Sequence, residues 1–194
     1  MGRKIRNSDP RTQGVRRVKL TPTKIPGVLA IEIEPLIDER GFFARTYCVE
    51  TLRSAGAALG TIRQTSISFN TQRGTLRGMH WQADPRPEGK IVRAASGRIF
   101  DAIVDLRRQS PTYRSWFGTE LDAKAQNALL IPPGCAHGFL TLEENCAIEY
   151  IMDADYIPAL ARGCRWNDPA FGIEWPFAPA NMSERDKNWP DFVP

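Results

Sequence analysis

The chain has 194 residues, of which 42% are hydrophobic and 25% are charged, a composition ordinary for a globular protein. It excludes a collagen-like, a largely disordered or a disulfide-dependent chain, and the length corresponds to about one domain. No apolar run reaches the roughly 18 residues of a transmembrane helix, and no apolar signal segment follows the charged first residues. We therefore expect a cytoplasmic protein.

The net charge of +4 is unevenly distributed. Residues 1–24 carry eight basic side chains and one acidic one, whereas the remaining 170 residues carry 18 basic and 21 acidic ones. We expect residues 1–24 to form a flexible basic extension and residues 25–194 a single domain. A basic arm can contact nucleic acid or an anionic membrane. This one has no aromatic residue for base stacking and no amphipathic period, so we expect neither partner.

Beyond the extension, the sequence predicts a series of short strands. Residues 28–34 alternate apolar and polar side chains, which is typical of a half-buried strand, and residues 41–47 are aromatic after a polar turn. A short helix is expected over residues 49–55 and another near 183–188, within an irregular region after residue 153. Further strands are expected at residues 63–69, 75–82, 90–95, 98–106, 116–121, 128–131, 137–142 and 147–152.

The segments between these strands are rich in glycine and proline. Many short strands separated by turn signals predict an all-β sandwich or barrel. Helices do not alternate with strands, so a doubly wound dinucleotide-binding fold is disfavoured.

The chain contains only two histidines, His80 and His137, and each lies in a glycine-flanked segment. His80 lies on the expected strand 75–82, so its imidazole projects into a cavity if that face of the strand points into a barrel. Histidine is suited to proton transfer near neutral pH. His80 is therefore a candidate general base, and a structural histidine is the alternative.

The main alternative role for the two histidines is metal binding, because many barrels with histidines in similar glycine-flanked segments bind a metal through three histidines and an acid. This chain has no third histidine and no His-x-His pair. A site of two histidines and one carboxylate stays open, but we expect no catalytic metal. The four cysteines form no CxxC pair, so we expect them to be reduced and mostly buried.

Other polar residues allow both a structural and a chemical interpretation. Lys90 would be solvent-exposed on an ordinary strand, but in a barrel interior its charge would stabilise an oxyanion. Arg40 and Arg77 lie beside glycines at strand or turn edges, where guanidinium groups suit phosphate. Tyr150 lies in an apolar strand and Asp186 near a helix start, so packing and helix capping are their alternatives.

The order of the motifs along the chain is more specific than any one of them. The motifs are RGFF from Arg40, LRGMHWQ from Leu76, GKIVR from Gly89, DLRRQSPT from Asp105, IPPGCAHGF from Ile131 and WNDPAFGIEWP from Trp166. Over residues 25–190 they closely resemble the dTDP-4-dehydrorhamnose 3,5-epimerase family. The resemblance implies a cupin-like jelly-roll barrel with short peripheral helices, which is usually a homodimer and uses neither a metal nor an organic cofactor.

The resemblance also implies catalytic roles. His80 matches the catalytic base, Asp186 the carboxylate that pairs with it, and Tyr150 the acid on the opposite face of the sugar. Lys90 matches a lysine near the sugar keto oxygen, where it would stabilise the enolate.

Further positions are implied in binding the nucleotide sugar. His137 matches a histidine that contacts the sugar, and Tyr156 matches a tyrosine that stacks on the base. Arg40, Arg77 and Gln64 match residues that contact the diphosphate. The first strands exchange between subunits in this family, so an arginine and a phenylalanine there complete the partner's site. These positions are His137, Arg40, Arg77, Gln64, Tyr156 and Phe42.

The chain departs from the family pattern at Arg45, Thr65, Ser66, Ile151 and Ala161. These positions lie near the nucleotide or the sugar and not in the catalytic set. The leading hypothesis is therefore epimerisation of a nucleotide-linked 4-keto-6-deoxy sugar, with dTDP as the expected nucleotide, at C3, C5 or both. The alternatives are a non-catalytic cupin that binds nucleotide sugars, a metal-dependent cupin enzyme, and a protein that works through its basic arm.

Overall fold

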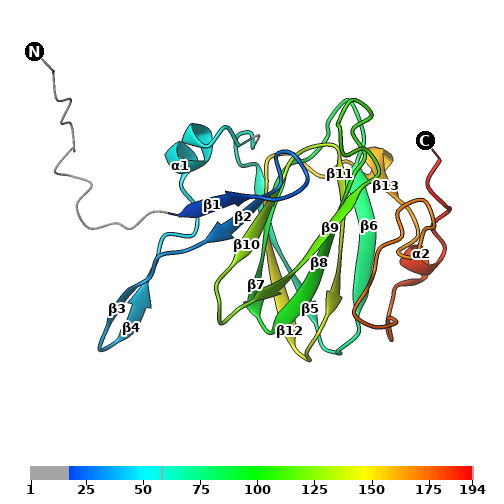
Figure 1. Cartoon of the computed structure of the whole chain (residues 1–194). Coiled ribbons are helices and arrows are strands. Elements are labelled where there is room, and N and C mark those ends of the chain that lie inside the picture. The colour runs from blue at the N-terminus through cyan, green and yellow to red at the C-terminus, as the bar shows by residue number, and fades with distance from the viewer. Residues whose placement is uncertain (1–17, 58, 194) are drawn as a thin grey trace, which may run out of the picture.

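Two antiparallel β-sheets face each other in the computed structural model, which describes residues 18–57 and 59–193 (Figure 1). The larger sheet has six strands in the order β1 (Lys19–Pro22), β2 (Leu29–Glu32), β10 (Ala128–Ile131), β7 (Lys90–Ser96), β12 (Cys146–Met152) and β5 (Gln64–Asn70). The smaller sheet has five strands in the order β13 (Ala161–Gly163), β6 (Leu76–Gln82), β11 (Cys135–Thr141), β8 (Arg98–Asp105) and β9 (Trp116–Asp122). The predicted all-β, cupin-like jelly-roll barrel is confirmed.

Short elements flank the two sheets. β3 (Leu36–Asp38) and β4 (Gly41–Phe43) form a separate hairpin that projects away from the barrel (Figure 1). The helices in the described residues are α1 (Val49–Ser54), the 3₁₀-helix η2 (Pro158–Leu160) and α2 (Glu184–Lys187). No helix in the described part of the chain is long and apolar enough to cross a membrane.

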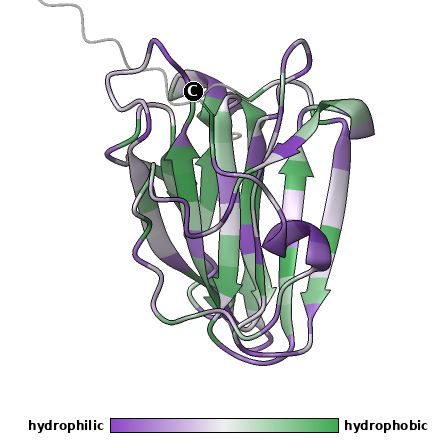
Figure 2. Cartoon of the chain, turned by 90° about the vertical axis from the view of Figure 1, so that its right-hand side faces the viewer, coloured by the Kyte–Doolittle hydropathy of each residue, from purple (hydrophilic) through white to green (hydrophobic). Residues whose placement is uncertain are grey.

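The main core lies between the two sheets. Val92 and Leu129 of the larger sheet and Ile103 and Phe139 of the smaller one are buried in a single cluster. Burial of a side chain of this size contributes about 1.5–3 kcal/mol relative to its exposure. Hydrophobic residues are concentrated on the strands, whereas α2 is hydrophilic (Figure 2). This packing fixes the strands that carry the polar residues described below.

The expected elements are largely confirmed, with differences near the N-terminus and after residue 153, where strand β13 was not predicted. The expected strand at 41–47 is limited to Gly41–Phe43, and strand β3 was not predicted. The boundary of the basic extension at residue 24 is also wrong, because Lys19–Pro22 forms β1. Its short sequence has no clear alternation, and pairing with β2 supplies the hydrogen bonds that define it. Residues 1–17, the rest of the expected extension, lie outside the described residues.

Candidate active site

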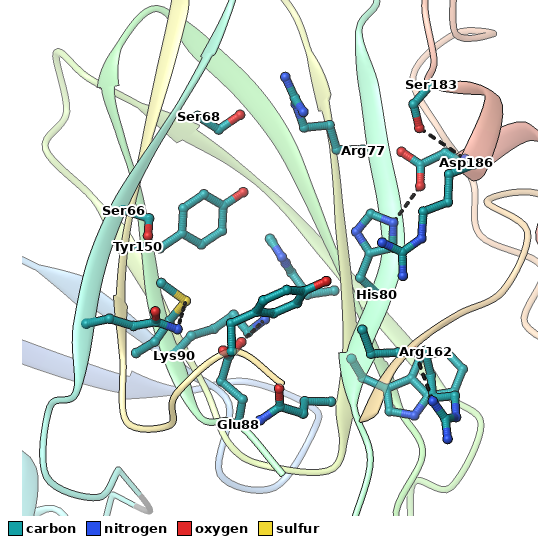
Figure 3. Close-up of a pocket in the computed structure, with 18 residues that line it drawn as sticks. Ser66, Ser68, Arg77, His80, Glu88, Lys90, Tyr150, Arg162, Ser183 and Asp186 are labelled. Carbon is teal, nitrogen blue, oxygen red and sulfur yellow. Dashed lines mark hydrogen bonds and ion pairs between the residues drawn. The ribbon is translucent and has the colours of Figure 1, made fainter. Parts of the chain in front are cut away.

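A pocket of about 620 Å³ opens among strands of both sheets, helix α2 and the segments that follow β12 (Figure 3). This volume is in the range of small-molecule sites, which span about 300–1,000 Å³. Eight of the ten predicted site residues line it, and they come from segments far apart in the sequence. These residues are Gln64, Arg77, His80, Lys90, His137, Tyr150, Tyr156 and Asp186.

His80 and Asp186 form a hydrogen-bonded pair at the pocket wall. His80 lies on β6 and Asp186 on α2, and His80 Nε2 lies 2.5 Å from Asp186 Oδ1. Ser183 caps α2, because its hydroxyl accepts the backbone N–H of Asp186 at 3.1 Å. The capping role considered for Asp186 therefore belongs to Ser183, and the Asp186 side chain is directed to His80.

The environment keeps Asp186 ionised. Burial raises the pKa of this carboxyl, but the hydrogen bond from His80 and the charge of that ring outweigh it, so the pKa lies below its usual value. An ionised Asp186 accepts the Nε2–H of His80 and leaves Nδ1 of the ring as the basic nitrogen. The ring of Trp189 packs edge-on against His80, with the ring centroids 6.3 Å apart. His80 is therefore held in one orientation and one tautomer.

His137 forms a second pair, with Asp101 of β8. His137 Nε2 lies 2.7 Å from Asp101 Oδ1, and both side chains are buried. Asp101 was not predicted, although an acid in the middle of the otherwise apolar run Ile99–Val104 is the signal that would have indicated it. This carboxylate fixes the His137 ring at the pocket wall.

A close approach of two strands brings the histidines together. His80 on β6 and His137 on β11 are direct cross-strand partners. Gly78 has a φ of +141°, and a Cβ atom at this position would lie only 2.5 Å from the Cα of Gly138. Glycine at both positions lets the backbones meet, which explains the glycines that flank each histidine in the sequence.

Tyr150 faces these residues from the opposite sheet. It lies on β12 of the larger sheet, whereas His80 and His137 belong to the smaller sheet, and Figure 3 shows Tyr150 across the pocket from His80. The rings of Tyr150 and His137 pack edge-on with their centroids 6.0 Å apart. Burial, and next the charge of Asp101, raise the pKa of the Tyr150 hydroxyl, so it is protonated at neutral pH.

Lys90 enters the same pocket from β7, the neighbour of β12. Its ammonium lies 2.6 Å from Glu88 Oε1, and both side chains are almost completely buried. The lysine therefore faces the barrel interior and is not the exposed strand residue of the alternative interpretation. Glu88 was not predicted as a site residue.

The predicted nucleotide-binding residues divide into two groups. Arg77 and Gln64 line the pocket, where Arg77 Nε donates to Asn70 Oδ1 at 2.8 Å and Gln64 Nε2 donates to the Ala154 carbonyl at 3.0 Å. Tyr156 lines it as well and is exposed. Ser66, one of the departures expected near the nucleotide or the sugar, lines the pocket. Further polar residues of the pocket were not predicted, namely Ser68, Gln82, Arg162, Ser183 and Arg185.

Arg40 and Phe42 do not line the pocket of their own chain. Both lie in the β3–β4 hairpin, and Phe42 is exposed. Arg40 Nη2 pairs with Asp38 at 2.5 Å on the surface. No group of three or more histidine, cysteine, aspartate or glutamate side chains in residues 18–57 and 59–193 is placed to hold a metal ion.

Comparisons with known proteins show which family the chain is similar to. The sequence model of the family described as dTDP-4-dehydrorhamnose 3,5-epimerase matches residues 22–193. The enzyme of that name from Methanothermobacter thermautotrophicus is 39% identical over 170 residues, which are 86% of this chain and 90% of the relative. The dTDP-4-dehydrorhamnose 3-epimerase from Streptomyces niveus is 34% identical over 171 residues, which are 88% of this chain and 82% of the relative.

Solved structures give the same result. The dTDP-4-dehydrorhamnose 3,5-epimerase from Bacillus anthracis, with TDP and PPi bound, superposes with a TM-score of 0.87 at 34% identity and covers 91% of this chain and 100% of that chain. A 3'-monoepimerase from Streptomyces bikiniensis, in complex with dTDP-quinovose, has a TM-score of 0.81 at 29% identity and covers 88% of this chain and 86% of that chain. The chain belongs to the dTDP-4-dehydrorhamnose 3,5-epimerase family.

Proposed function

We propose that the protein epimerises a dTDP-linked 4-keto-6-deoxy sugar at C3, C5 or both, and that it needs no cofactor. One observation carries the proposal. A histidine–carboxylate pair, His80 with Asp186, faces a protonated tyrosine, Tyr150, across one pocket. A base and an acid on opposite sides of a substrate are what inversion of a carbon centre requires.

Proton removal is assigned to His80. A proton next to a ketone is weakly acidic, so a base alone removes it slowly. Nδ1 of His80 would take the proton, and Asp186 would stabilise the imidazolium that forms. The electron pair of the C–H bond would move to the C4 oxygen, where the Lys90 ammonium would stabilise the enolate. General acid and base groups each contribute roughly 10²–10⁴-fold to such steps.

Proton return is assigned to Tyr150. Its hydroxyl would protonate the enolate carbon from the face opposite to His80, and the centre would invert. The proton removed and the proton delivered belong to different residues, so His80 ends protonated and Tyr150 ends as a phenolate. Exchange with water resets both groups. Every inversion therefore introduces a solvent proton into the sugar.

The remaining pocket residues are assigned to binding. Arg77 and Gln64 would contact the diphosphate, and Tyr156 would stack on the base. Forked guanidinium groups suit phosphate oxygens. His137, fixed by Asp101, would contact the sugar. Binding of the nucleotide, remote from the reacting carbons, positions a small neutral sugar between base and acid.

The protein is further proposed to act as a homodimer with exchanged N-terminal strands. The β3–β4 hairpin exposes Ile37, Phe42 and Phe43. Edge strand β5 exposes Ile67 and Phe69, and its residues Gln64, Ser66 and Ser68 line the pocket. Apolar patches of this kind indicate an interface. A hairpin from one copy laid against β5 of the second would bring Arg40 and Phe42 to the partner's pocket.

A cytoplasmic location is also proposed, on the basis of the cysteines. Cys48, Cys135, Cys146 and Cys164 are all free thiols. Free thiols are typical of a reducing compartment.

Proton NMR of dTDP-4-keto-6-deoxyglucose in deuterated water tests the function. We expect loss of the C3 signal, the C5 signal or both, with inversion, and a loss of at least ~10²-fold in His80→Ala. Glu184→Gln is a matched control, because Glu184 lies on α2 beside Asp186 and pairs with Lys187 on the surface. Binding of dTDP without any proton exchange would refute catalysis and support the nucleotide-sugar-binding alternative.

A further inference from the structure

Glu88 is an acidic residue of the pocket that the proposed reaction does not use. Its Oε1 lies 2.6 Å from Lys90 Nζ, and the two side chains are only 9% and 11% exposed. One residue separates them where the chain enters β7, and their contact places both side chains on the same side of the chain. Both line the pocket (Figure 3).

The backbone between the two residues is fixed by Asp153. The Gly89 N–H donates to Asp153 Oδ1 at 2.7 Å, and the Asp153 N–H donates to the Gly89 carbonyl at 3.1 Å. A Cβ atom at position 89 would lie 2.8 Å from Asp153 Oδ2 and 3.1 Å from Pro133 Cδ. Glycine therefore allows this anchor on one side of the chain while Glu88 and Lys90 face the pocket on the other.

A lysine in this place needs a partner. Its ammonium lies on a flexible four-carbon stem, and an unpaired buried ammonium is costly. Charge stabilisation in an active site depends on groups that are already in place when the charge develops. A lysine that moved between conformers would have to be ordered in each reaction cycle.

We propose that Glu88 is a positioning residue, which holds the Lys90 ammonium where the enolate oxygen forms. This inference rests on the proposed function. Glu88 itself is a poor proton acceptor for the sugar, because its carboxylate already pairs with the ammonium. Glu88 therefore affects the reaction by positioning Lys90. The charge of Glu88 also contributes, after burial and Asp101, to the raised pKa of the Tyr150 hydroxyl, which places the carboxylate in the field of that group.

A double-mutant cycle tests this role. The rate of deuterium exchange into the sugar is measured for wild type, Glu88→Ala, Lys90→Ala and the double variant, and dTDP affinity is measured for each. We expect Glu88→Ala to lower the exchange rate ~10²-fold, as a misplaced catalytic group does, with unchanged dTDP affinity. In the Lys90→Ala background the same substitution should change the rate less than about twofold, because residues that act as a unit are not additive.

Two further variants separate positioning from general destabilisation. Glu88→Gln keeps an oxygen that accepts from the ammonium, so its loss should be less than about tenfold, since a neutral acceptor forms a weaker bond. Glu32→Gln removes the charge of an exposed pair, with Lys19 at 2.8 Å, and should leave the rate unchanged. An equal loss on Glu88→Ala in both backgrounds, or wild-type exchange in Glu88→Ala, overturns the proposal. Absence of exchange in wild type would instead overturn the proposed function.

Discussion

His80 and His137 lie directly opposite each other on β6 and β11, and each is hydrogen-bonded to a different carboxylate. The two rings differ in access. The His80 side chain is 41% exposed, whereas that of His137 is 6% exposed. Only His80 combines an accessible ring with a carboxylate that fixes its tautomer. This difference supports the proposed roles, proton transfer for His80 and a fixed sugar contact for His137.

Removal of the Asp186 charge should weaken His80 as a base. Asp186→Asn keeps the size of the side chain but leaves the imidazolium without a counter-charge. We expect the exchange rate to fall ~10²-fold, while dTDP affinity, measured by calorimetry, stays within about twofold. A parallel loss of nucleotide affinity would indicate that α2 has moved, and a rate unchanged by the substitution would remove Asp186 from the mechanism.

Removal of Asp101 should affect stability as well as activity. The carboxylate is fully buried, and Asp101→Ala leaves the Nε2 of buried His137 without this partner. We expect a loss of about 1–3 kcal/mol in the free energy of unfolding, as for other unsatisfied buried polar groups. Urea denaturation measures it. Glu120→Ala on β9 removes an exposed partner of Arg98 and should cost less than about 1 kcal/mol. Equal losses in both variants would contradict this assignment.

Asp105 should make stability depend on pH in the acid range. Burial alone would raise the pKa of this carboxyl, but hydrogen bonds from Arg107, Ser110 and Thr112 outweigh it and lower the pKa from 3.8 to about 2. A lowered pKa means that the stabilisation is complete above about pH 4 and is lost as the pH falls toward 2. The lowered pKa of Asp105 contributes about 2 kcal/mol to the free energy of unfolding at neutral pH.

The test is urea unfolding of wild type and Asp105→Asn between pH 7 and pH 2. The difference in unfolding free energy between wild type and Asp105→Asn should be constant down to about pH 4 and should shrink below it. A gap that widens on acidification would show the opposite sign of the pKa shift.

The hairpin should control the oligomeric state. Ile37 of the hairpin is 80% exposed. Val193 in the C-terminal segment is similarly exposed, at 83%, and serves as the control position. Ile37→Asp should produce monomers in sedimentation velocity and raise the KM for the substrate roughly tenfold, because Arg40 no longer reaches the partner's pocket. Val193→Asp should remain dimeric with an unchanged KM. A monomeric wild type would refute the exchanged-strand assembly.

The sequence predicted the barrel better than its edges. The residues of strands such as Ala128–Ile131 are apolar or alternate between apolar and polar, so the local sequence predicts which of them are buried. β1 and β3 carry no such pattern, since their pairing partners and not their own residues define them. These short edge strands were therefore missed.

The site could be predicted only in part. His80, Tyr150 and Asp186 come from three separated segments, and no local spacing relates them, so the family resemblance supplied their association. Asp101 and Glu88 are single acids whose partners, His137 and Lys90, become visible only when the side chains are placed. Polar contacts across strands depend on register and side-chain direction, which the residue pattern does not specify.

In the proposed mechanism, two residues on opposite sheets transfer the two protons. The most direct test is Tyr150→Phe with the keto sugar in deuterated water, followed by proton NMR. We expect His80 still to exchange the C3 or C5 proton, while inversion falls at least ~10²-fold, so that deuterium enters with retained configuration. Inversion at the wild-type rate in Tyr150→Phe would contradict it.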